Sequence, residues 1–110
     1  MNKTAPMPTV SETIVFVADS RKLWSEDERL EFISYLSANP KAGEVCPGSG
    51  GCRKVRWSRE GTGKRGGVRV IYFVTTSEQS LWLLLIYSKA QKDNIPAHIL
   101  KSIRMEFENA

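Results

Sequence analysis

The chain has 110 residues, of which 41% are hydrophobic and 25% charged, and its formal net charge is +4. This length fits one domain and is too short for a second core, and no apolar run approaches the roughly 20 residues that span a membrane. We therefore expect a single domain over residues 1–110, with residues 1–11 as a flexible lead. The N-terminus has no apolar signal region, so we expect a cytoplasmic protein.

The sequence predicts neither a metal site nor a cofactor. Cys46 and Cys52 lie in a glycine-rich stretch, and His98 is the single histidine, so a zinc site lacks ligands. In a cytoplasmic protein we expect both cysteines to be free thiols.

In chain order, the β-rich run 13–18 predicts a first strand. Ser25 and Glu28 have capping-box spacing and begin a helix. Its apolar positions are Leu30, Ile33 and Leu36, with Phe32 beside them, and Asn39-Pro40 ends it. Residues 41–52, with four glycines, predict a loop.

Three consecutive strands are predicted at 53–57, 68–75 and 81–87. A glycine-rich turn over 58–67 and a hairpin connection over 76–80 join them. Residues 81–87 are apolar throughout, which favours a central strand covered on both faces. Asn94-Ile95-Pro96 opens a last helix whose apolar positions are Ile99, Leu100, Ile103 and Phe107. The order favours an α+β fold: a small, mostly antiparallel sheet with helices packed on one face.

The positive charge is concentrated in one block. Residues 53–72 hold seven basic side chains and Glu60, a net charge of +6. Successive side chains in a strand alternate between faces, so we expect Lys54, Arg56 and Arg69 on one open face, opposite the apolar residues of the same strands. Lys64 and Arg65, in the turn, should overhang that face. Such a patch favours binding of polyanions.

Cationic side chains can also cleave RNA without a metal. Arginine and lysine can stabilise the pentacovalent phosphate, and a lysine crowded by other cations can act as a base. Tyr87, at the end of its strand, is a candidate to line the site and stack on a base. Composition alone favours plain nucleic-acid binding over catalysis.

The motifs resemble a known family. Residues 39–43, 47–57, 63–72 and 83–89 are together similar to the HigB-like branch of the RelE/ParE toxin superfamily, and the resemblance extends over about residues 13–105. It implies the compact antiparallel fold and the toxin of a type II toxin–antitoxin pair. Such a toxin cuts mRNA in the ribosomal A site without a metal, is neutralised by a helix-turn-helix antitoxin, and meets operator DNA only through the antitoxin complex.

By the same resemblance, Lys54 and Arg56 fall at two catalytic basic positions, and Arg69 falls at the arginine that holds the scissile phosphate. Lys89 lies where further basic residues occur, and Lys92 adds to them. The tyrosine and arginine that RelE places after this strand are not matched, since Pro96 and Ala90 stand near those positions. The general acid and base therefore stay open.

Two alternatives share the same fold. A ParE-like toxin would poison gyrase without nuclease activity, and a non-catalytic RNA-binding module would bind RNA without cutting it. A gyrase binder has no need of a cationic open face, which favours the endoribonuclease.

Overall fold

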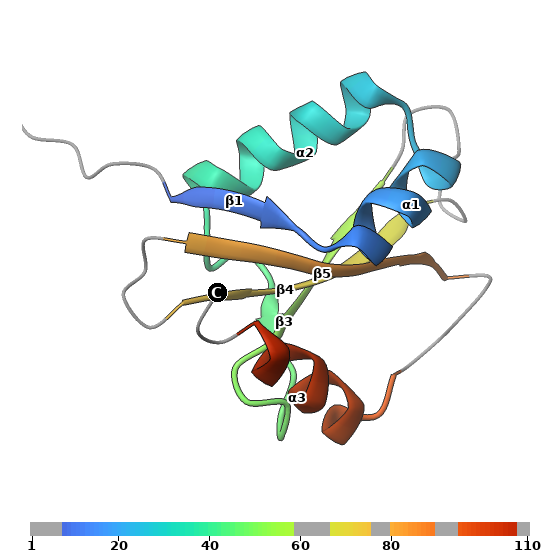
Figure 1. The fold of residues 1–110 in the computed structure, drawn as a ribbon. Helices are drawn as coiled ribbons and strands as arrows, with labels where there is room; N and C mark the ends of the chain where they lie inside the picture. The colour runs from blue at the N-terminus through green and yellow to red at the C-terminus, as the bar shows by residue number, and fades with distance from the viewer. Residues whose placement is uncertain (1–7, 59–66, 76–79, 90–94, 108–110) are drawn as a thin grey trace, which may run out of the picture.

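A computed structural model of the chain describes residues 8–58, 67–75, 80–89 and 95–107. Its elements are β1 (Thr9–Glu12), α1 (Ile14–Leu23), α2 (Glu26–Ala38), β2 (Glu44–Val45), β3 (Arg53–Trp57), β4 (Val68–Val74), β5 (Ser80–Ser88) and α3 (Ala97–Glu106). The strands form one sheet in the order β1-β5-β4-β3-β2. β1 runs parallel to β5, and all other neighbouring strands are antiparallel (Figure 1). The predicted α+β class with a mostly antiparallel sheet is confirmed.

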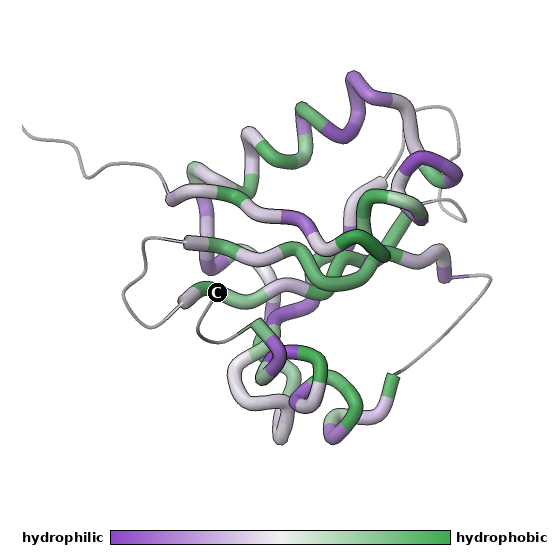
Figure 2. The backbone as a smooth tube through the Cα atoms, viewed as in Figure 1, coloured by the Kyte–Doolittle hydropathy of each residue, from purple (hydrophilic) through white to green (hydrophobic). Residues whose placement is uncertain are grey.

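The helices lie on both faces of the sheet rather than on one, as Figure 1 shows. α1 and α2 cover one face, where their Phe16, Phe32 and Leu36 pack against the strands. α3 covers the opposite face, where Leu100 is buried. The helix arrangement thus differs from the expected one, because β4 and β5 are apolar on both faces and each face needs a cover. The predicted double cover of residues 81–87 is confirmed, and Figure 2 shows these two hydrophobic strands between the helices.

Thr13 connects the first strand to the first helix: it follows the last residue of β1 and is the N-cap of α1. Its backbone N–H donates to the Leu83 carbonyl at 3.1 Å. Its hydroxyl donates to the Leu84 carbonyl at 2.9 Å and accepts from the Phe16 N–H at 3.0 Å, which is the N-cap bond of α1.

The predicted strand over 13–18 is therefore wrong, because those residues begin α1 and leave Ile14 88% exposed. The first strand is β1, inside the segment expected to be a flexible lead; residues 1–7 of that lead lie outside the described residues. β-branched residues favour a strand locally, but the cap and the pairing of β1 with β5 decide the outcome.

α2 begins as predicted. The Ser25 hydroxyl accepts from the Glu28 N–H at 3.1 Å, and the Glu28 carboxylate accepts from the Ser25 N–H at 2.8 Å, which is a complete capping box. The helix ends at Ala38, before Asn39. Its buried face differs from the prediction: Phe32 is buried while Leu30 is 51% exposed.

The remaining strands and the last helix are close to the predicted bounds. β3 matches its prediction, β4 ends one residue early, and β5 extends one residue further at each end. The loop predicted over 41–52 contains the two-residue strand β2. Pro96 is the N-cap of α3. The predicted turns lie mostly outside the described residues, at 59–66 and 76–79.

The pairing of β4 with β5 has one irregularity. Ile71 pairs with Leu85, whereas Tyr72 pairs with Leu83, so Leu84 is an additional residue in β5, as in a β-bulge. Leu83 packs in the α1/α2 layer, and Leu84 packs in the α3 layer. The bulge fixes which side chains at the end of β5 face α3.

Among the residues described, no helix has the length and apolar character that crossing a membrane requires.

Replacing Thr13 by valine should destabilise the protein by about 1–2 kcal/mol, because both the helix cap and the bond to β5 are lost. Urea unfolding followed by circular dichroism measures the difference. Thr9→Val, at an exposed threonine of β1, is the matched control and should be near neutral. Equal stability of the two variants would contradict the role given to Thr13.

Candidate nucleic-acid interface

Strand alternation places the basic residues of β3 and β4 as predicted. Val55, Val68 and Val70 lie in the α1/α2 layer. Lys54, Arg56 and Arg69 alternate with these valines and therefore lie on the opposite face, which is the α3 face. This part of the sequence prediction is confirmed.

Three of the predicted residues stand directly opposite one another across three strands. Arg56 of β3 pairs with Arg69 of β4, and Arg69 pairs with Tyr87 of β5. We call these three residues the arginine row. Side chains at directly opposite positions have Cβ atoms about 4.5–5.5 Å apart, so two arginines and a tyrosine leave the same face at adjoining positions. Arg56 is exposed, Arg69 is half-buried, and Tyr87 is buried.

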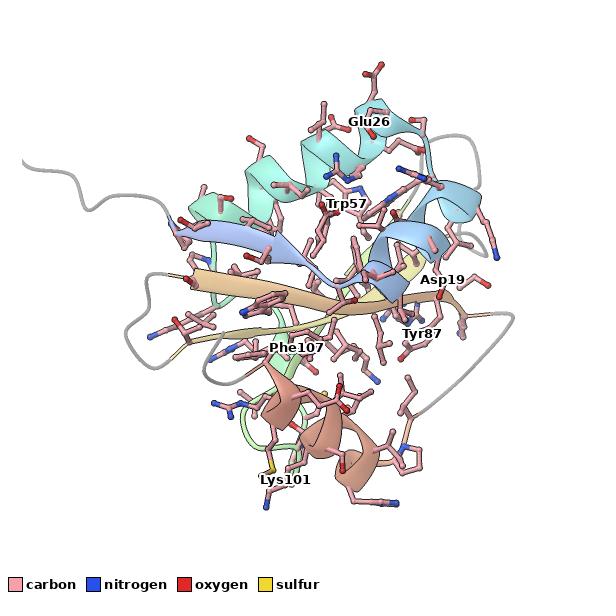
Figure 3. The ribbon with its side chains drawn as sticks, in the orientation of Figure 1. Asp19, Glu26, Trp57, Tyr87, Lys101 and Phe107 are labelled. Carbon is pink, nitrogen blue, oxygen red and sulfur yellow. The ribbon has the colours of Figure 1, made fainter. Side chains whose placement is uncertain are left out.

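α3 covers only part of this face, and the covered part includes Tyr87. Its apolar side chains pack with Ile71, Phe73 and Leu84, and the Phe107 ring lies 4.8 Å from the Trp82 ring. Figure 3 shows Phe107 between the sheet and α3, and Tyr87 at the other end of β5. Within the arginine row, Tyr87 is therefore covered, whereas Arg56 is exposed to solvent.

The other predicted site residues divide into two groups. Lys54 is half-buried, precedes Arg56 by two positions on the same face, and pairs with Glu44 of β2. Lys89 is exposed directly after β5. Lys64, Arg65 and Lys92 lie outside the described residues.

A pocket of about 300 Å³ adjoins the arginine row. Lys54 and Tyr87 line it from the sheet, Leu100 lines it from α3, and Glu44 with Pro47 line it from the hairpin that precedes β3. Sequence reasoning did not find Glu44, because β2 is too short to be recognised from a residue pattern. Its position became apparent only from the β2–β3 register.

Three residues within the basic block hold the fold together through their contacts. The Arg53 guanidinium donates to the Gly43 carbonyl at 2.7 Å. The Tyr72 hydroxyl donates to the Pro40 carbonyl at 2.7 Å and accepts from the Gly43 N–H at 2.9 Å. Trp57 packs on Phe32, with ring centroids 5.2 Å apart, and Figure 3 shows it between α2 and the sheet. The bonds of Arg53 and Tyr72 hold the segment before β2 against β3 and β4.

Gly43 has a steric role in this contact. A Cβ atom at position 43 would lie 2.9 Å from the Lys54 carbonyl oxygen and 2.9 Å from the Tyr72 ring. The segment can approach β3 this closely only with glycine, and that approach sets the start of β2.

Both cysteines are free, as expected. Cys52 is fully buried, and burial raises the pKa of its thiol. Burial also raises the pKa of Cys46, against the opposing effect of nearby Lys54. A raised pKa keeps a thiol protonated and unreactive. Within the described ranges, no three His, Cys, Asp or Glu side chains are grouped to hold a metal.

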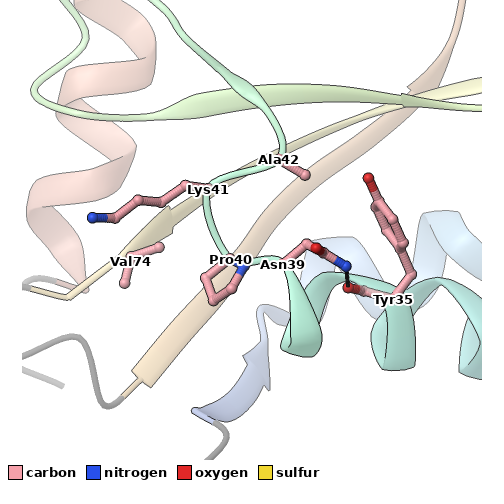
Figure 4. Close-up of a pocket in the computed structure, with 6 residues that line it drawn as sticks. All are labelled: Tyr35, Asn39, Pro40, Lys41, Ala42 and Val74. Carbon is pink, nitrogen blue, oxygen red and sulfur yellow. Dashed lines mark hydrogen bonds between the residues drawn. The ribbon is translucent and has the colours of Figure 1, made fainter. Parts of the chain in front are cut away.

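A larger pocket, of about 540 Å³, lies at the C-terminal end of α2 (Figure 4). Tyr35, Asn39, Pro40, Lys41, Ala42 and Val74 line it. Lys41 is the single charged residue in this lining, so the pocket is less complementary to a polyanion than the arginine row is.

No protein-family model matches the chain. Solved structures do resemble it. The E. coli toxin RelE in the free state, a double arginine-to-alanine mutant, is similar with a TM-score of 0.61 and 13% identity, over 93% of this chain and 98% of that chain. The intact E. coli RelBE toxin–antitoxin complex gives a TM-score of 0.54 at 16% identity, over 72% of this chain and 93% of that chain.

The same RelE mutant bound to the antitoxin RelBc peptide gives a TM-score of 0.52 at 16% identity, over 74% of this chain and 82% of that chain. At such identities the likeness concerns the fold. The architecture implied by the sequence motifs is thus confirmed.

Tyr72 should make stability depend on alkaline pH. Burial raises its pKa, against the opposing effects of Gly43 and Arg53, so the folded protein holds the phenolic proton more tightly than the unfolded chain does. This contribution is complete below the ordinary pKa of about 10 and is lost as the pH rises toward the folded-state pKa.

Urea unfolding at about pH 8 and about pH 11 should show a smaller alkaline loss of stability for Tyr72→Phe than for the wild type. At the lower pH, Tyr72→Phe should cost about 1–2 kcal/mol, because the Gly43 N–H loses its buried partner. Tyr35→Phe, at an exposed tyrosine of α2, should keep most of the alkaline loss, because Tyr35 is the smallest of the causes that shift the pKa of Tyr72. An unchanged alkaline loss in Tyr72→Phe would show that Tyr72 is not its source.

Proposed function

We propose that this chain, which has the fold of the toxin RelE, is itself the toxin of a toxin–antitoxin pair and an endoribonuclease that cleaves mRNA in the ribosomal A site. The observation that carries the proposal is the arginine row, which places two arginines at adjoining positions on one face of the sheet. The motif resemblance to the HigB-like branch supports the same activity. A cytoplasmic location follows from this function.

In the proposed reaction a base removes the proton of the ribose 2′-hydroxyl and the 2′-oxygen bonds to the adjacent phosphorus. The bond between phosphorus and the 5′-oxygen breaks, and an acid or water gives that oxygen a proton. The products are a 2′,3′-cyclic phosphate and a 5′-hydroxyl. Arg69 holds the scissile phosphate and, with Arg56, neutralises the charge that develops on its oxygens. Lys54 and Lys89 supply further positive charge.

No metal is needed for this reaction, since the two arginines supply the charge that a metal would otherwise supply. Tyr87, at the end of the row, is buried and lines the adjoining pocket. Lys64, Arg65 and Lys92 would extend the contact along the RNA backbone.

The proposed partners are mRNA on the ribosome and a cognate helix-turn-helix antitoxin. The two RelE structures solved with antitoxin support an antitoxin partner. The toxin would bind operator DNA only as part of its complex with the antitoxin.

Primer extension on mRNA from induced cells tests the function directly. A ribosome-dependent endoribonuclease gives new 5′ ends within translated regions, and these ends disappear when translation initiation is blocked. Arrested growth with a DNA-damage response and intact mRNA would instead indicate a gyrase poison. RNA binding with no new ends would indicate a binding module.

Arg69→Ala should abolish growth arrest and reduce cleavage by about 100-fold or more, because a phosphate-stabilising cation is lost. The variant should remain folded, since the side chain is half-buried at the open end of the sheet. Arg21→Ala, at an exposed arginine of α1, is the matched control and should keep full toxicity. A folded and fully toxic Arg69→Ala protein would refute the assigned role.

Binding to RNA should weaken steeply with salt, because phosphate contacts release counterions. Arg56→Ala should lower the slope of log K against log salt concentration by about 1, in line with one lost phosphate contact. Fluorescence anisotropy with a labelled RNA measures the slope. An unchanged slope would place Arg56 away from the RNA.

A further inference from the structure

The pocket beside the arginine row has the composition of a small-ligand site. Pro47, Ile71 and Leu100 give it apolar walls, and Glu44 and Lys54 add two charged groups. Apolar walls with a few placed polar groups are typical of sites that take a planar ring. Its volume of about 300 Å³ lies at the lower end of the range for such sites, which suits one base rather than an oligonucleotide.

The two charged groups are held next to each other by the sheet. Glu44 of β2 and Lys54 of β3 are direct register partners, so both side chains leave the same face at neighbouring positions. The pair presents one ammonium donor beside the two acceptor oxygens of a carboxylate.

The pocket is continuous with the arginine row. Tyr87 lines the pocket and pairs with Arg69, and Lys54 lines it two positions before Arg56 on the same strand face. When a phosphate is held between Arg56 and Arg69, the base of an adjoining nucleotide can therefore reach the pocket.

We propose that this pocket binds a guanine base of the RNA next to the phosphate held by Arg56 and Arg69, an inference that rests on the proposed function. The Watson–Crick edge of guanine carries an acceptor, O6, followed by two donors, the N1–H and the N2 amino group. Lys54 matches the acceptor and the Glu44 carboxylate matches the two donors. The apolar walls contact the faces of the ring.

The other bases fit this pair less well. Adenine and cytosine each place a ring-nitrogen acceptor where guanine has the N1 donor, so a carboxylate oxygen would meet a lone pair there. Uracil has one donor flanked by two carbonyl acceptors. An acidic side chain also repels the RNA backbone, so Glu44 gains nothing from general phosphate attraction and acts through base discrimination.

Calorimetric titration of the purified protein with guanosine and adenosine 5′-monophosphates tests the pocket without any need for cleavage. The wild type should bind the guanosine nucleotide at least about 5-fold more tightly, the lower limit for a good bidentate pair. In Glu44→Gln the preference should fall to within about 2-fold, because the amide presents one acceptor where the carboxylate presents two, and Lys54 still opposes the amino group of adenine. Equal binding of both nucleotides by the wild type would overturn the proposal.

Glu31→Gln is the matched control, since Glu31 is an exposed glutamate on α2, away from the α3 face. It should keep the wild-type preference. If Glu44→Gln also keeps it, Glu44 only pairs with Lys54 and the proposal is overturned.

Sequencing the 5′ ends of transcripts from induced cells gives the second test. Guanine should be enriched at one fixed position relative to the cut, and Glu44→Gln should weaken that enrichment while Glu31→Gln does not. Persistent cutting with unchanged base preference in Glu44→Gln overturns the pocket and leaves the proposed function intact. Guanosine-selective binding with no cleavage by the wild type refutes the proposed function and supports the pocket.

Discussion

The central strand β5 is apolar on both faces, and the rest of the fold follows from covering it. Leu83 and Ile86 face the α1/α2 layer, whereas Leu84 and Tyr87 face α3. β4 pairs with one edge of the strand, and β1 pairs with part of the other. Thr13 then turns the chain from that edge onto the face, because its hydroxyl bonds both to β5 and to the first turn of α1.

The same constraint determines where the sheet can act on a ligand. α3 is ten residues long, and its apolar side chains cover only part of the second face. The uncovered part lies where β3 and β4 carry arginines instead of apolar residues. The Arg104 guanidinium, 4.8 Å from the Phe73 ring centroid, marks the covered half. α3 thus covers one part of this face, and the arginines occupy the other part.

Much of the fold could be predicted from the sequence, because several signals are local. Ser25 and Glu28 form a capping box from spacing alone, and alternation of side chains placed Lys54, Arg56 and Arg69 on one face. The error at 13–18 has a non-local cause, since its helix depends on a bond from Thr13 to a residue 71 positions away. A β-branched run cannot reveal that partner.

The candidate site, too, was predictable from the sequence only where the signal is local. Strand parity indicated the basic residues, while the Arg56–Arg69–Tyr87 register required the positions of three strands. Glu44 was missed because β2 contains two residues, and its place depends on the close approach of Gly43 to Tyr72. Lys64, Arg65 and Lys92 stay predictions.

The shortness of β2 has a consequence for solubility. A long, flat edge strand pairs readily with the edge of another molecule and seeds aggregation. Here the edge ends after Val45, carries the charge of Glu44, and is followed by Pro47, which has no N–H to donate. The sheet therefore cannot grow by intermolecular pairing on this side, and the residues that prevent such growth are the same ones that form a wall of the pocket.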